Sequence, residues 1–197
     1  MKLLVNTTSP YTRIARIALA EKGLAELTTE VVDPWGDTPQ LLQANPAGRV
    51  PTLITDDGQS LTESLLILLW LEHQRPEPSL MSHDSTGAVA RAGIAIGVID
   101  AAVHTIIGRK ITDTSFDSSS VGLRRRRSMA DGLARLEGNA PEYKDGTPAI
   151  DVITAVVALD YIDFRFSEAP WLPALPTLRS LAARIAPRAS FKNSQPR

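Results

Sequence analysis

The stretch NPAGRVPTLITDDGQSLTES, residues 45–64, contains the clearest fold signal in the sequence. Two short β-prone segments, residues 51–54 and 60–61, flank an Asp-Asp-Gly turn at residues 56–58, which predicts a β-hairpin. The next segment, residues 64–74, has a helical pattern that is apolar nearly all round, so we expect it to be buried on more than one side. A hairpin followed directly by a buried helix indicates part of an α/β domain.

The residues upstream of this stretch extend the alternation of strands and helices. The predicted strands are residues 2–6 and 28–32, and the predicted helices are residues 10–22 and 40–44. The longer of these helices is amphipathic and is expected to end at Gly23, because glycine is the usual residue just past a helix C-terminus. The order β-α-β-α-β-β-α predicts an α/β domain over residues 1–75.

The pattern of the sequence changes after residue 75. A proline-containing segment, residues 76–83, is interpreted as a linker, and no convincing strand follows it. The remainder, residues 84–197, is expected to form an all-α domain. The predicted helices are residues 84–110, 118–137, 148–166 and 175–185, and the polar tail from residue 192 is expected to be loose.

Composition excludes several classes of function. The 197 residues include no cysteine, so the chain has no disulfide, no Cys-ligated metal site and no thiol nucleophile of its own. The net charge of −1 argues against broad binding to nucleic acid or to a membrane surface. His73, His83 and His104 lack the spacing of metal ligands, so no metal site is expected. Neither a signal peptide nor a membrane-spanning run is expected, which makes a cytoplasmic location the default.

Two short motifs have both a structural and a chemical interpretation. Ser9-Pro10 opens the first predicted helix, where serine is a common N-cap and proline a common first residue. A hydroxyl at a helix N-terminus also lowers the pKa of a thiol bound beside it. Val50-Pro51 opens a predicted strand, and the sequence does not show whether this bond is cis or trans. A cis bond would present the Val50 backbone for pairing with an extended peptide ligand.

A third motif, Thr62-Glu63-Ser64, precedes the next predicted helix. In a purely structural interpretation, Thr62 or Ser64 caps that helix. In a functional interpretation, the Ser64 hydroxyl and the helix N–H groups hold a carboxylate, while Glu63 faces an ammonium group. The motif is therefore suited either to capping or to binding the head of an amino acid.

Taken in order, these motifs and the helical domain after them resemble the glutathione S-transferase superfamily. The stretches SPYTRIARIALAEKGL (9–24), NPAGRVPTLITDDGQSLTES (45–64) and ALDYIDFRF (158–166) carry the resemblance, which covers nearly the whole chain. It implies an α/β thioredoxin-like N-terminal domain that binds glutathione, followed by an all-α C-terminal domain. The implied protein is a cytoplasmic glutathione transferase that acts in detoxification, with glutathione and a small apolar electrophile as its substrates and no metal. It also implies a homodimer, since members commonly pair through the third helix.

The resemblance implies roles for individual residues. Ser9 stands where serine-type bacterial members have their thiol-activating residue, with Thr7 and Thr8 as alternatives. The implied glutathione contacts are Arg49, Val50, Pro51 (the cis-proline of the family), Glu63 and Ser64. The candidates for a cosubstrate pocket are Tyr11, Trp35 and His104.

Two departures from the family pattern keep other functions open. Arg49 stands where lysine is common, and Thr147 and Asp151 are four residues apart, so the capping box of the late helix is lost or shifted even if Thr147 still caps it. One alternative is therefore a binding or interaction protein that keeps the fold without turnover. Another is a glutathione-dependent isomerase, although residues 7–9 differ from the Ser-Ser-Cys start that is usual in such relatives.

Overall fold

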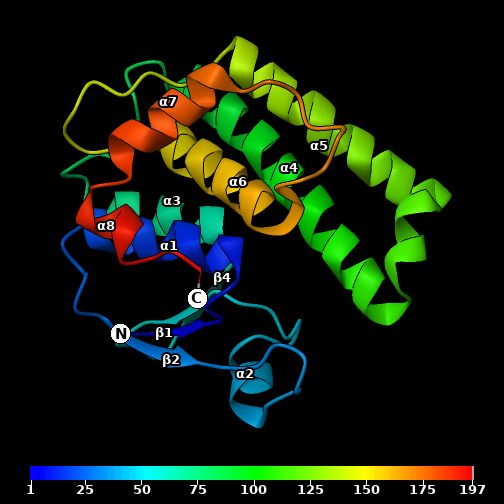
Figure 1. Cartoon of the computed structure of the whole chain (residues 1–197). Coiled ribbons are helices and arrows are strands. Elements are labelled where there is room, and N and C mark those ends of the chain that lie inside the picture. Colours follow the sequence, from blue (N-terminus) through cyan, green and yellow to red (C-terminus); the bar gives the residue numbers. More distant parts are fainter. Residues whose placement is uncertain (197) are drawn as a thin grey trace. The chain divides into compact units, whose positions relative to one another are not determined.

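The computed structural model describes residues 1–196 and divides the chain into two units (Figure 1). The first unit contains the residues up to Leu80 together with the segment from Ala186 onward, and the second contains Met81–Ile185. The C-terminal segment therefore groups with the first unit, which differs from the prediction that residues 84–197 form one helical domain. Arg197 lies outside the described residues.

The first unit follows the predicted order β-α-β-α-β-β-α. Its elements are β1 (Lys2–Val5), α1 (Pro10–Glu21), β2 (Thr28–Val31), α2 (Pro39–Ala44), β3 (Thr52–Ile54), β4 (Ser60–Thr62) and α3 (Ser64–Gln74). The strand order is β2-β1-β3-β4, with β2 parallel to β1 and with β3 antiparallel to both β1 and β4. The hairpin predicted around residues 56–58 is the β3–β4 hairpin.

The register aligns one end of each strand. Val5 pairs with Val31, Leu4 pairs with Thr52, and Thr52 pairs with Thr62. The loops after β1, after β2, before β3 and after β4 therefore leave the sheet at the same end, which is termed the loop end. Helices cover both faces of the sheet (Figure 1). Leu41 of α2 belongs to a buried cluster with Leu4 of β1, while α1 and α3 contact each other.

Helix α3 is buried on one face and exposed on the other. Ile67, Leu68 and Leu71 are at most 2% exposed, whereas Leu66 and Leu69 are 58% and 68% exposed. The prediction that this helix is buried on more than one side is therefore wrong within a single chain. An apolar pattern on all sides does not show which side the rest of the unit covers.

The regular elements of the second unit, residues 81–185, are all helices, joined by loops such as residues 139–149. Its elements are α4 (Ser85–Ile111), the 3₁₀ helix η1 (Thr114–Ser118), α5 (Ser120–Gly138), α6 (Ile150–Phe166) and α7 (Pro176–Ile185). Helix α4 packs along both α5 and α6 and remains continuous despite its glycines. By length and composition α4 would also be able to cross a membrane, a property that it shares with core helices of helical bundles.

Helix α6 begins two residues later than predicted. Its N-cap is Ala149, which makes no side-chain cap, so the expectation that Thr147 caps this helix is wrong. Asp151 in the first turn accepts a hydrogen bond from Arg91 Nε of α4 at 2.8 Å. The side chain of Asp151 is only 3% exposed, and a carboxylate near a helix N-terminus is stabilised by the helix dipole. A contact between helices thus takes the place of the local capping box.

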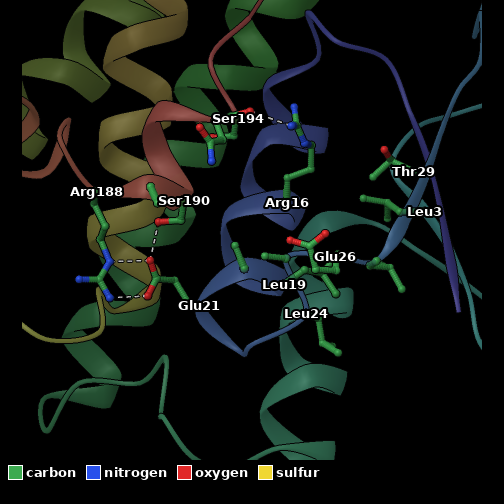
Figure 2. Close-up of a pocket in the computed structure, with 15 residues that line it drawn as sticks. Leu3, Arg16, Leu19, Glu21, Leu24, Glu26, Thr29, Arg188, Ser190 and Ser194 are labelled. Atoms are coloured by element: carbon green, nitrogen blue, oxygen red, sulfur yellow. Dashed lines mark hydrogen bonds and ion pairs between the residues drawn. The ribbon is translucent and has the colours of Figure 1, made fainter.

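The C-terminal segment forms α8 (Ala189–Lys192), which contacts α1 within the first unit (Figure 2). The guanidinium of Arg188 donates two hydrogen bonds of 2.6 Å to the Glu21 carboxylate, and the Ser190 hydroxyl donates to the same group. Phe191 is 1% exposed and Ser194 is 3% exposed. The prediction of a loose tail is therefore wrong for residues 192–194, where Arg16 of α1 donates to the Asn193 carbonyl and Ser194 is buried.

Candidate functional site

The loop end of the first unit gathers the predicted glutathione-binding residues. Ser9 lies between β1 and α1, residues 50–51 precede β3, and residues 63–64 follow β4. Trp35 lies in the loop that follows β2. Because the strand register aligns these four ends, the topology brings segments that are far apart in sequence to one edge of the sheet.

Ser9 caps α1 and still has a hydroxyl proton to donate. Its Oγ accepts a hydrogen bond of 3.2 Å from the Thr12 backbone N–H, and no group in residues 1–196 accepts its own proton. Thr8 differs, because its hydroxyl donates to Asn6 Oδ1 at 2.9 Å. Ser9 is therefore a cap and also an available donor at the positive end of a helix.

The Val50–Pro51 peptide bond is cis. Neither the N–H nor the C=O of Val50 has a hydrogen-bond partner among the described residues. The preceding carbonyl, that of Arg49, accepts hydrogen bonds from Asn45 Nδ2 and Thr52 Oγ1, each at 2.9 Å. An anchored backbone with an unpaired N–H and C=O is suited to pairing with an extended peptide. The sequence did not predict that Asn45 and Thr52 support this turn. The signal available in the sequence was the presence of a polar residue before and after Val50-Pro51.

The N-terminus of α3 has no side-chain cap. The N-cap residue is Glu63, with a φ of 64° that is uncommon for a residue other than glycine, and it makes no capping hydrogen bond. Capping by Thr62 or Ser64 is therefore wrong. Ser64 is 3% exposed at the start of the helix, whose first N–H groups are available to an anion. Arg49 Nη1 lies 3.7 Å from Glu63 Oε1, and both side chains are largely exposed.

The three candidates for a cosubstrate pocket lie in different units. Tyr11 is half-buried in the first turn of α1, and Trp35 is 52% exposed after β2, both in the first unit. His104 is an exposed residue of α4 in the second unit, with Nδ1 2.6 Å from the Asp100 carbonyl oxygen. A shared pocket for these three residues stays a prediction.

A pocket of about 450 Å³ lies at a different place on the first unit (Figure 2). It is bordered by α1, the α1–β2 loop, the strands and the C-terminal segment, and it includes Leu3, Leu24 and Glu26. Arg16 at its border donates a hydrogen bond of 2.8 Å to the Asn193 carbonyl. None of the predicted site residues lines this pocket. No cluster of three or more potential metal-ligating side chains occurs within residues 1–196.

Similarity to known proteins covers both units. The family model for the glutathione S-transferase N-terminal domain matches residues 8–74. The crystal structure of a glutathione S-transferase from Methylobacterium radiotolerans, in complex with glutathione sulfonate, is similar with a TM-score of 0.89 and 32% identity. That similarity covers 99% of this chain and 94% of the other chain.

Two curated relatives are similar over their whole length. The GST-like protein YibF of Escherichia coli (strain K12) is 28% identical over 202 residues, covering 100% of this chain and 98% of YibF. The maleylacetoacetate isomerase of Pseudomonas aeruginosa is 29% identical over 207 residues, covering 100% of this chain and 96% of the isomerase. Together with the thioredoxin-like α/β unit and the helical unit after it, these similarities show that the chain belongs to the glutathione S-transferase superfamily.

Proposed function

We propose that this protein is a glutathione S-transferase in which Ser9 stabilises the glutathione thiolate for attack on an electrophile. The observation that carries the proposal is the combination at the loop end. A serine donor, an unpaired Val50 backbone and an uncapped α3 N-terminus all lie at one edge of the sheet. The relative from Methylobacterium radiotolerans, which is complexed with glutathione sulfonate, supports the choice of ligand.

The groups at the loop end complement the parts of glutathione. The cysteinyl backbone pairs with the N–H and C=O of Val50, which follow the pattern of strand addition beside Pro51. The γ-glutamyl carboxylate accepts hydrogen bonds from the Ser64 hydroxyl and the first N–H groups of α3, while Glu63 faces the ammonium group. Arg49 balances the charge of Glu63 and attracts the carboxylates of the ligand.

The chemistry of the site follows from the pKa of a thiol. A free thiol with a pKa of about 8.5 is mostly protonated at neutral pH, whereas the thiolate is the nucleophile. A donated hydrogen bond from Ser9 and the N-terminal end of α1 both favour the charged form. The thiol proton leaves to solvent, and the sulfur forms its bond to the electrophilic carbon. Either a leaving group departs with its electron pair, or a double bond is saturated as its other carbon takes up a proton from solvent.

The test is the pKa of glutathione bound to the protein, measured by ultraviolet thiolate absorbance. We expect a value about one to two units below the free thiol in the wild type, and a return toward about 8.5 in Ser9→Ala. Ser9→Asp keeps an N-cap acceptor but adds a negative charge, so it also raises this pKa without loss of the cap. Thr8→Val is the matched control, because the Thr8 hydroxyl already donates to Asn6. An unchanged pKa in Ser9→Ala contradicts the role of Ser9, and an absence of glutathione binding contradicts the proposed function.

A second candidate is a glutathione-dependent isomerase, favoured by the full-length similarity to maleylacetoacetate isomerase. An isomerase returns glutathione at the end of each cycle, whereas a transferase consumes one thiol for each product. Counting free thiols during turnover of an aryl halide, and of a cis-configured unsaturated diketo acid, separates the two. Glutathione binding without turnover of either substrate favours the interaction protein.

The remaining properties belong to the same proposal. The electrophile is small and apolar, and Tyr11, Trp35 and His104 are each candidates for contact with it. The protein is a cytoplasmic homodimer that acts in detoxification and requires no metal. The exposed apolar face of α3 supports the dimer.

A further inference from the structure

We infer that Asn45 and Thr52 are positioning residues that orient the Val50 backbone for the cysteinyl unit of glutathione. The inference rests on the proposed function, because it concerns the support of the same binding site. It starts from one atom, the carbonyl oxygen of Arg49. This oxygen accepts one hydrogen bond from Asn45 Nδ2 and one from Thr52 Oγ1, each 2.9 Å long.

The side chains of Asn45 and Thr52 are both buried and hydrogen-bonded. Asn45 is 5% exposed and Thr52 is 0% exposed. Asn45 Nδ2 also lies 3.4 Å from Thr52 Oγ1, and Asn45 Oδ1 accepts the Ala47 N–H at 3.0 Å. Because both polar atoms of the Asn45 amide have partners, its orientation is determined, and a fully satisfied buried network of this kind is rigid.

The anchored carbonyl determines where the next N–H points. The Arg49 C=O and the Val50 N–H belong to one planar trans peptide group, in which the two bonds point in opposite directions. Holding the carbonyl toward Asn45 and Thr52 therefore turns the Val50 N–H away from them. That N–H has no partner in the part of the chain described, so it is available to a ligand.

A tilt of this peptide group would act on the ligand in two ways. It would weaken the pairing with the cysteinyl backbone, which raises the Kd for glutathione. It would also move the sulfur relative to the hydroxyl of Ser9, and a misplacement of about 1 Å in an active site costs up to about 100-fold in rate. A purely structural role predicts neither a change in the thiol pKa of the bound ligand nor a specific loss of affinity.

The experiment uses two near-isosteric variants of the full chain. Thr52→Val removes one donor with little change of shape, and Asn45→Asp keeps the acceptor for Ala47 but places an oxygen against the Arg49 carbonyl. We expect the Kd for glutathione, measured by calorimetry, to rise by about tenfold or more in each variant. The pKa of the bound thiol, measured by thiolate absorbance, should return toward about 8.5.

The matched control is Thr154→Val. Thr154 is also 0% exposed, and its hydroxyl donates to the Ile150 carbonyl at 2.8 Å in α6 of the second unit. We expect this variant to lose comparable folding stability but to keep both the affinity and the thiol pKa of the wild type.

The outcomes are separable. A folded Thr52→Val with wild-type affinity and thiol pKa overturns the inference and leaves the proposed function intact. An equal loss of binding in Thr154→Val also overturns the inference, since the effect is then one of general stability. A wild type that binds no glutathione overturns the proposed function itself. If Asn45→Asp does not fold, Thr52→Val decides alone.

Discussion

Lys22 lies just after the last turn of α1, and its side chain is 0% exposed. Its Nζ donates to Glu72 Oε2 at 2.6 Å and to the carbonyl oxygens of Arg75 and Pro78 at 2.6 and 2.7 Å. These contacts join the end of α1 to the end of α3 and to the segment after it. The buried ammonium of Lys22 thus holds together the end of α1, the end of α3 and the segment that follows α3.

Replacing Lys22 with methionine keeps an apolar stem of similar length but removes the donors. Glu72 then loses its cation and the carbonyls of Arg75 and Pro78 lose a donor, so we expect the free energy of unfolding to fall by about 3 kcal/mol. Urea unfolding measures this change. The control is Lys144→Met, because Lys144 is 84% exposed in its pair with Glu142 and should have little effect. Equal losses of unfolding free energy in the two variants would contradict a stabilising role for the buried Lys22 ammonium.

Glu72 makes this contact depend on pH. Burial raises the pKa of Glu72, but hydrogen bonds from Lys22, Ser79 and the Leu80 N–H together lower it below its ordinary value of 4.5. The unfolded state therefore binds more protons between the folded pKa and 4.5. The stabilisation that the ionised Glu72 carboxylate provides is complete above the pKa that Glu72 has in the unfolded state. It is lost as the pH falls through the pKa that Glu72 has in the folded state.

Glu72→Gln tests this dependence. Its free energy of unfolding should fall less steeply than that of the wild type as the pH is lowered from about 5 to about 3, because the titrating carboxylate is gone. Urea unfolding at several pH values provides the measurement. Glu26→Gln is the control, since Glu26 is exposed and has no hydrogen-bond partner among residues 1–196. Parallel pH profiles for wild type and Glu72→Gln would refute the prediction.

Among the elements, α6 depends on a contact with α4 for the start of its first turn. Asp151 is 3% exposed and Arg91 is 14% exposed, and Arg91 Nε donates to Asp151 at 2.8 Å. Asp151 Oδ1 also accepts the Val152 N–H at 3.0 Å. The N-cap residue Ala149 makes no side-chain cap, so this buried ion pair contributes a polar contact that the cap position does not.

Arg91→Met should therefore lower the free energy of unfolding of the second unit by more than a variant that removes an exposed ion pair. It leaves the Asp151 carboxylate buried without a cation, and we expect a loss of about 3 kcal/mol in the free energy of unfolding. Chemical unfolding followed by circular dichroism reports this loss. The control is Arg179→Met, which breaks the 2.8 Å pair with Asp163 where both side chains are at least 36% exposed. The prediction fails if Arg91→Met lowers the free energy of unfolding by no more than Arg179→Met does.

For the whole molecule, the exposed face of α3 is the surface that we propose for contact between chains. Leu66 and Leu69 are three residues apart, so they lie on the same side of the helix. Two exposed leucines on one helix face favour burial against a partner surface. We propose a second copy of this chain as that partner, in line with the homodimer implied by the family.

Leu69→Glu should convert the proposed dimer to a monomer, since it places a charge in the centre of an apolar contact. Sedimentation velocity at micromolar concentration measures the molecular mass of wild type and variant. Val31→Glu is the control, because Val31 is similarly exposed at 66% but belongs to β2. A monomeric wild type, or equal dissociation by both variants, would contradict an interface at α3.

Sequence reasoning located nearly all the longer elements, because their signals are local. The Asp57-Gly58 turn and the glycine after α1 lie where predicted, and Gly23 has the positive φ of 75° that favours glycine. It missed α8 and the 3₁₀ helix η1, which are short and lack a strong period. It also placed the cap of α6 at Thr147, since a capping motif says nothing of an arginine on another helix.

For the candidate site too, some features follow from the sequence and others only from the tertiary structure. Ser9, Val50 and residues 63–64 stand in recognisable motifs, so the sequence by itself determined the order of the elements, the family resemblance and the identity of these candidates. Only the tertiary structure decided that their loops meet at one end of the sheet and that the Val50 backbone is unpaired. The physical reason is that strand register and buried hydrogen bonds join residues far apart in the chain, whereas helix and turn signals extend over only a few neighbouring residues.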